Sequence, residues 1–142
     1  AGLKPKARMA NESEFLSGKK TIMVATTAFG MGIDLDSVDL VIHFNMSLSL
    51  TDYMQQIGRA GRNGQKAHAV LLYSDEDYYT NLAILHDGHP TLRGMGQLDI
   101  MKEFCDDNEH CMAQLLLEHF GQKMKKSCKH CTVCQKNRRA EK

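Results

Sequence analysis

The chain has 142 residues, a net charge of +1 and an apolar fraction of 42%. This size suits one ordinary globular domain or slightly more, and the balanced charge excludes a strongly basic or acidic protein. No run of residues is long and apolar enough to cross a membrane, and the first residues lack the apolar core of a secretory signal. We therefore expect an intracellular protein with no membrane partner, in which the five cysteines suit metal binding better than disulfides.

The charge is unevenly distributed along the sequence. Acidic residues dominate between Ser74 and His110, whereas basic residues dominate after Gly121. With so small a net charge, any attraction to nucleic acid has to come from a local basic segment.

The first two thirds of the chain alternate between helical and strand patterns. A run of helix formers from Pro5 to Leu16, followed by Ser17-Gly18, predicts a surface helix. Short apolar, β-branched runs predict buried strands, at residues 20–26, 38–44 and 67–73. Two more helices are predicted for residues 50–60, with Tyr53 and Ile57 on the inner face, and for residues 75–86, with Ser74 as N-cap. This order predicts an α/β fold with a parallel sheet.

The segment after residue 87 contains several helix-breaking residues. We place a boundary between Asp87 and Gly96, where the pattern is interrupted by Gly88, Pro90, Gly94 and Gly96. Two short helices are predicted beyond it, with apolar faces made by Leu98, Met101, Phe104 and Cys105, and by Met112, Leu115, Leu116, His119 and Phe120. A helical pair of this size has little core of its own and needs a staple.

Four cysteines near the C-terminus can supply that staple. Cys128, Cys131 and Cys134 recur at equal intervals, and tetrahedral Zn²⁺ takes a fourth sulfur, here from Cys111. Unrelated buried cysteines and a redox Cys-x-x-Cys pair are the alternatives, and a third cysteine at the same interval disfavours the redox pair. Cys105 lies on the apolar helical face and is expected to be a small buried thiol.

A second chemical motif lies between Gln55 and Gly64. Arg59 and Arg62 are three residues apart among glycines, at the expected end of a helix. On one helical face, both guanidiniums would reach the same anion, as in a sensor of a nucleotide γ-phosphate. The alternative is a solvated basic helix end followed by a glycine turn.

Three segments in this order resemble the RecQ family of DNA helicases: ATTAFGMGID from Ala25 to Asp34, GRAGR from Gly58 to Arg62, and the four-cysteine cluster. The resemblance implies an N-terminally truncated second RecA-like lobe, of the P-loop NTPase type, in residues 1–88. It implies a helical zinc-binding subdomain in residues 89–135, followed by a basic tail in residues 136–142. It also implies a structural Zn²⁺, the use of ATP and Mg²⁺, and ATP-dependent unwinding of DNA in the 3′ to 5′ direction during repair and recombination.

The resemblance assigns roles residue by residue. Arg62 falls on the family's arginine finger and Arg59 on its companion. Three more positions are assigned to nucleotide binding. Gly32 and Asp34 lie in the loop that couples ATP to DNA, and Gln55 precedes the arginines. The zinc ligands fall on Cys111, Cys128, Cys131 and Cys134.

This sequence contains no G-x-x-x-x-G-K-[ST] phosphate loop. ATP and Mg²⁺ are therefore expected to be bound mainly by a missing N-terminal RecA-like lobe, and the chain alone is expected to hydrolyse no ATP. Junctions of single-stranded and duplex DNA are the expected partner. The expected location is the nucleus of a eukaryote or the cytoplasm of a bacterium.

The chain also departs from the family at several positions. Gln56 replaces a frequent glutamate and Asn63 a frequent aspartate, which predicts weaker carboxylate pairing to the arginines. Ser47 stands where proline is usual, and Met112-Ala113 replace a frequent pair of arginines.

Two other classes of function fit the sequence. One is a non-catalytic nucleic-acid-binding or regulatory zinc module, whose tail contacts phosphates through Lys136, Arg138, Arg139 and Lys142. The other is an RNA helicase of the DEAD-box type, a family that lacks this zinc cluster. An ATPase assay on the intact gene product and its zinc content discriminate among the three.

Overall fold

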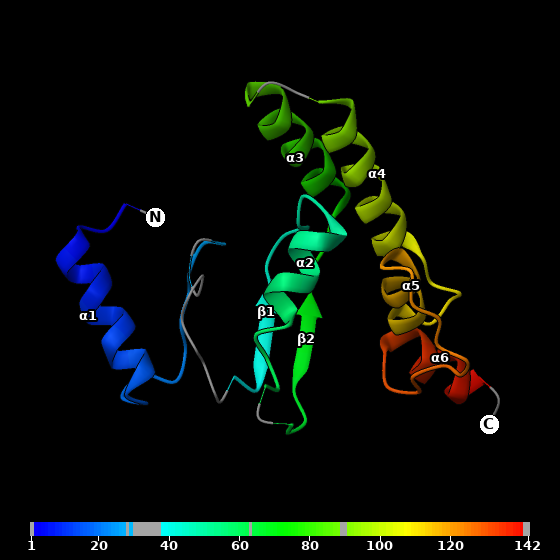
Figure 1. Cartoon of the computed structure of the whole chain (residues 1–142), viewed down its shortest axis with the longest axis horizontal. Coiled ribbons are helices and arrows are strands. Elements are labelled where there is room, and N and C mark those ends of the chain that lie inside the picture. Colours follow the sequence, from blue (N-terminus) through cyan, green and yellow to red (C-terminus); the bar gives the residue numbers. More distant parts are fainter. Residues whose placement is uncertain (1, 28, 30–37, 63, 89–90, 141–142) are drawn as a thin grey trace.

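The computed structural model describes residues 2–27, 29, 38–62, 64–88 and 91–140. The elements, shown in Figure 1, are α1 (Pro5–Leu16), β1 (Leu40–His43), α2 (Leu50–Ile57), β2 (His68–Leu71), α3 (Asp75–Asp87), α4 (Leu92–Asp106), α5 (Met112–His119) and α6 (Thr132–Ala140). Strands β1 and β2 pair in parallel, with α2 as the connection between them. The predicted α/β class is confirmed. No helix in the described ranges has the length and apolar character to cross a membrane.

Helix α1 forms where the sequence predicts it. Pro5 stands at its start, where a fixed φ and a missing N–H cost nothing. Gly18 follows the helix at φ 73°, a left-handed conformation that suits glycine. None of the helix's residues is buried, and Figure 1 shows α1 lying apart from the two strands.

The prediction of a strand over residues 20–26 is wrong. In the structure this segment has no regular conformation, and Ile22 and Val24 are 79% and 93% exposed. A strand is stabilised by its hydrogen-bonded neighbours, and among the described residues no strand pairs with this segment. An apolar, β-branched run has a local preference for the extended conformation, but it forms a strand only when a neighbouring strand pairs with it.

The other two predicted strands are present but shorter. Leu40 pairs with His68 and His43 with Leu71, so β1 and β2 are in register over four residues. Helix α2 covers the face of β1 that carries His43, whose ring centroid lies 5.0 Å from that of Tyr53. On the other face Leu40 and Ile42 are 50% and 56% exposed. The expected burial on both faces is therefore wrong for these strands.

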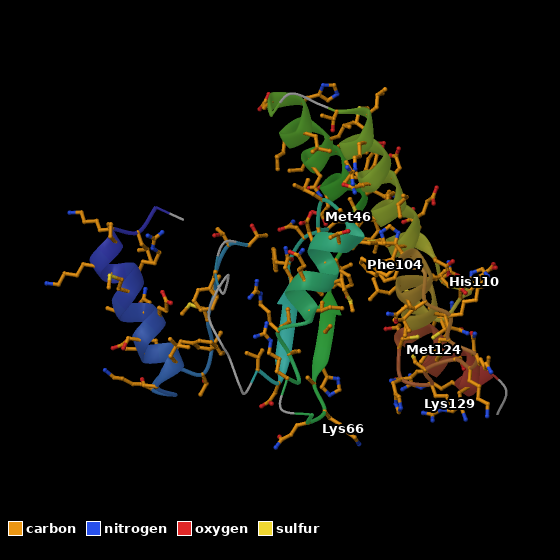
Figure 2. The ribbon with its side chains drawn as sticks, viewed as in Figure 1. Met46, Lys66, Phe104, His110, Met124 and Lys129 are labelled. Carbon is orange, nitrogen blue, oxygen red and sulfur yellow. The ribbon has the colours of Figure 1, made fainter. Side chains whose placement is uncertain are left out.

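The buried core lies where α2 meets α4. Its members come from the loop after β1, from α2 and from α4: Met46, Leu50, Tyr53, Leu98, Met101 and Phe104. Figure 2 labels Met46 and Phe104 at this junction. The inner faces predicted for α2 and α4 are confirmed.

Helix α4 differs from the expected short helix. It runs for 15 residues from Leu92, so Gly94 and Gly96 lie inside it, and their predicted role as interruptions is wrong. The Oγ1 of Thr91 accepts a hydrogen bond from the Gly94 N–H at 3.1 Å and so begins the helix. Because α4 packs on α2, it belongs to the main core, and the division at residue 88 stays a prediction. A further helix, α6, occupies most of the predicted tail.

Candidate metal centre and arginine loop

Four cysteine sulfurs meet between α5 and α6. The Sγ atoms of Cys111, Cys128, Cys131 and Cys134 all lie within 4.8 Å of one another. The Cys128 and Cys134 sulfurs are 4.0 Å apart. Zn–S bonds of about 2.3 Å in a tetrahedron place the sulfurs about 3.8 Å apart. The cluster therefore fits a structural Zn²⁺ held by four thiolates, with no position left open for a substrate.

The backbone around the cluster donates to the sulfurs. Cys111 precedes α5, and Cys134 lies in the first turn of α6. The Cys128 N–H donates to the Cys111 sulfur at 3.2 Å. The N–H groups of His130 and Cys131 donate to the Cys128 sulfur at 3.4 and 3.3 Å. Such donation stabilises the charged thiolate that a metal requires.

Burial and hydrogen bonding both shift the pKa values of the cysteine thiols. Burial raises the pKa of Cys111, but hydrogen bonds from the backbone of Cys128 and Gln114 and from neighbouring sulfurs outweigh it and lower the pKa to about 6. Burial and hydrogen bonds with the other sulfurs raise the pKa of Cys134 to about 12. Adjacent thiolates repel one another, so a divalent cation is what allows all four to be charged together.

Cys105 takes no part in this cluster. Its side chain packs against the core of α2 and α4. Burial, with the nearby charge of Asp106, raises its pKa to about 12. Cys105 packs on the core as the sequence predicts but is half-buried, not fully buried, and its high pKa makes it a poor nucleophile.

The two arginines lie in a loop and not on a helix. Helix α2 ends at Ile57 with Gly58 as its C-cap, and Gly61, between the arginines, has φ 71°. A Cβ at Gly61 would lie 3.1 Å from the Gln65 carbonyl oxygen, so a side chain would be crowded there in a backbone conformation that already favours glycine. The expectation that Arg59 and Arg62 share a helical face is wrong, because glycines end the helix and turn the chain.

This arginine loop, described for residues 58–62 and 64–67, is fastened to the segment that leads into β1. The Gly61 N–H donates to the Val38 carbonyl at 3.1 Å, and the Arg62 Nε donates to the Gly58 carbonyl at 3.3 Å. Val38 precedes β1 and the loop precedes β2, so the arginines lie at the amino ends of the strands. In Figure 2, Lys66 marks this end and Met46 the opposite one.

The remaining nucleotide-side residues are only partly visible. Gln55 lies on α2 with an exposed side chain. Gly32 and Asp34 lie outside the described residues, as does most of the loop that contains them. Their predicted roles stay predictions.

Gln56 connects α2 to β1. Its Oε1 accepts from the His43 Nε2 and, at 3.4 Å, from the Ser47 Oγ. Burial lowers the pKa of His43, and the bond to Gln56 only partly offsets this, so the ring is neutral near pH 7. With the proton on Nε2, Nδ1 is left as a buried lone pair that has no partner in the described part of the chain. The amide of Gln56 thus fastens the helix that leads into the arginine loop.

A buried polar network, which the sequence did not predict, surrounds residues 45–49. The Asp77 carboxylate, 8% exposed, accepts from the Asn45 Nδ2 at 2.6 Å, the Met46 N–H at 3.3 Å and the Ser74 N–H at 3.1 Å. The Asn81 Nδ2 donates to the Met46 carbonyl at 2.8 Å. Burial raises the pKa of Asp77, but these donors prevail and hold it below its usual value. The Ser-x-x-Asp capping box was the available signal, whereas Asn45 is too distant in sequence to predict.

Comparisons with known proteins agree with this site. Residues 62–135 match the RecQ zinc-binding family, and residues 1–64 match the helicase conserved C-terminal domain. The chain belongs to the RecQ family and covers a C-terminal helicase region with its zinc-binding part.

Three relatives illustrate the match. The chain is 38% identical over 140 residues to the ATP-dependent DNA helicase hus2/rqh1 of Schizosaccharomyces pombe, which covers 94% of this chain. It is 32% identical to the RecQ-like DNA helicase blm-1 of Caenorhabditis elegans and 31% identical to the ATP-dependent DNA helicase RecQ of Bacillus subtilis, each over 98% of this chain. The chain spans 10%, 15% and 24% of the length of the S. pombe, C. elegans and B. subtilis proteins.

Proposed function

We propose that this chain acts as the back half of a RecQ-like, ATP-dependent helicase core that unwinds DNA in the 3′ to 5′ direction during repair and recombination. The observation that carries the proposal is the presence, in one chain, of a tethered arginine loop and a four-cysteine centre within a RecQ-family match. Relatives that match nearly the whole chain are named DNA helicases. The proposed location is the nucleus in a eukaryote or the cytoplasm in a bacterium.

ATP would bind in the cleft between this lobe and a first lobe that brings the phosphate loop and Mg²⁺. Arg62 then stabilises the charge that develops on the γ-phosphoryl group, and Arg59 assists it or holds the loop. The hydrogen bond from Gly61 to Val38 supports this role, because a finger has to approach from a fixed backbone. By family resemblance, Asp34 and the loop from Thr26 to Gly32 sense the nucleotide and the position of the strand, and Gln55 contributes to nucleotide binding. In this proposal the chain alone hydrolyses no ATP.

The test is steady-state ATPase kinetics of the protein that joins this chain to a first lobe, with DNA saturating. Arg62→Ala should lower kcat about a thousandfold to a hundred-thousandfold, or roughly 4 to 7 kcal/mol of barrier, with nucleotide binding largely intact. Arg62→Lys should recover little of it, because an ammonium lacks the planar fork. If Arg62→Ala keeps near-normal turnover and only raises KM, Arg62 binds the ground state, and the same assay on Arg59→Ala then tests the other arginine.

A non-catalytic nucleic-acid-binding module is the second candidate, and one observation favours it. Residues 121–140 contain seven Lys or Arg and no Asp or Glu, and all seven basic side chains are exposed. An intact protein that binds DNA but lacks any DNA-stimulated ATPase activity would support this candidate over the helicase. For the DEAD-box alternative, the match to the RecQ zinc-binding family is contrary evidence.

A further inference from the structure

The turn that carries two of the four cysteines contains an unfavourable backbone conformation. Lys129, between Cys128 and Cys131, has φ 63° and is the only non-glycine residue with positive φ among the described residues. This left-handed region is disfavoured for residues with a Cβ. The turn has to hold this shape for both sulfurs to reach one ion, so interactions around it must offset the strain.

Gln135 binds this turn from the neighbouring helix. Its side-chain Nε2 donates to the His130 carbonyl at 2.7 Å, and its backbone N–H donates to the Cys131 carbonyl at 3.0 Å. Gln135 also follows Cys134 directly in the sequence. One residue therefore joins the turn that holds Cys128 and Cys131 to the helix that holds Cys134.

Gln114 makes a second link of the same kind. Its Nε2 donates to the Met124 carbonyl at 3.0 Å. The bond joins α5, which begins directly after Cys111, to the segment that leads into Cys128. Figure 2 labels Met124 and Lys129 on the two stretches of loop that lie beside α5 and α6.

We propose that Gln135, assisted by Gln114, is a positioning residue for the zinc centre: its amide holds the ligand-bearing turn in its left-handed shape and so slows the release of Zn²⁺. An amide suits this place, because its NH₂ group donates to a carbonyl without adding charge beside the thiolates. Groups that orient metal ligands from outside the coordination sphere commonly affect metal affinity. This inference rests on the cysteine cluster alone and is independent of the helicase proposal.

The test compares Gln135→Ala with Asn137→Ala in the 142-residue chain loaded with Zn²⁺. Asn137 lies two residues further along α6 and is exposed. Alanine favours a helix at least as well as either residue, so neither change weakens α6 through helix propensity. Transfer of Zn²⁺ to an excess of a chromogenic chelator gives the release rate. Absorption of the Co²⁺-loaded chain reports the geometry of the four thiolates.

Gln135→Ala should release Zn²⁺ about ten times faster than the parent chain and change the Co²⁺ spectrum. Asn137→Ala should match the parent in both. Lys129→Gly removes the left-handed cost and should slow release again when combined with Gln135→Ala. Equal release from Gln135→Ala and Asn137→Ala would overturn the proposal. So would a Gln135→Ala chain that fails to fold in saturating Zn²⁺, or a double variant without rescue, since either result would make Gln135 a general structural residue.

Discussion

Two loops of this protein are held in place by different means. The loop of residues 45–49 rests on the core of α2 and α4, and buried polar side chains such as Asp77 and Asn81 fix its backbone. The turn of residues 128–131 rests on little apolar surface of its own, because α6 buries only Val133 and α5 contributes only half-buried residues to the main core. Where a core already orders the chain, hydrogen bonds suffice to select one conformation. Where the core is small, a metal supplies the missing stabilisation.

Removal of Zn²⁺ is the strongest test of this difference. A chelator should unfold residues 107–140 and leave the core of α2 and α4 protected, because structural zinc contributes apparent free energies of about 10 to 16 kcal/mol. The border lies at Asp107 because α4 contributes fully buried residues to the main core, whereas α5 adds only half-buried ones. Hydrogen exchange followed by mass spectrometry measures protection along the chain. Simultaneous loss of protection in α2 and α5 would show that the two regions are not distinct.

Two cysteine variants form the control for that experiment. Cys111→Ser should abolish zinc binding, whereas Cys105→Ser should keep the full zinc content, since Cys105 packs in the core and outside the cluster. Elemental analysis of the purified variants decides between them. The reverse pattern would mean that the ligand set is wrong.

Asp77→Asn tests the other loop. The change places an NH₂ group among three donors, and we expect a loss of about 2 kcal/mol in the free energy of unfolding, measured with urea. The folded-state pKa of Asp77 is lowered, so its stabilisation is fully present above the unfolded pKa of about 3.9 and is lost as the pH falls through the lower folded value. The variant should lack this part of the acid dependence.

The control for this prediction is Glu76→Gln, a neighbouring and exposed carboxylate in the first turn of α3. It should change the stability only slightly. Both variants should retain zinc, because the network of Asp77 lies outside the cysteine cluster. Loss of zinc in Asp77→Asn would contradict the separation of the two loops.

The smallest expected effect concerns DNA binding by the basic segment of residues 121–140. The isolated chain should bind DNA weakly, without sequence preference, and less tightly as salt rises, because its net charge is +1 and any contact relies on the basic residues 121–140. Combined replacement of Lys136, Arg138 and Arg139 by alanine should flatten the slope of log K against log salt by about 2 to 3. Fluorescence anisotropy with labelled single strands measures this. The same charge removed at the start of the chain, from Lys4, Lys6 and Arg8, is the matched control. An equal loss there would refute a local binding surface.

The features that depend on neighbouring residues can be predicted from the order of the amino acids alone. Helix α1, the Ser74 N-cap and the apolar faces of α2 and α4 follow from local spacing. The run from Cys128 to Cys134 also predicts a metal centre, because three thiols this close in sequence lie close together in space.

Which distant segments meet could not be predicted in this way and is seen only in the folded chain. The fold placed α4 in the main core despite Gly94 and Gly96, and it left residues 20–26 without a strand to pair with. It brought Asn45 to Asp77 across 32 positions, and it put Arg59 and Arg62 on a turn tied to Val38. Periodicity shows which side of a helix or strand is apolar. Strand pairing and helix packing depend also on the other segment against which that side is placed in the folded chain.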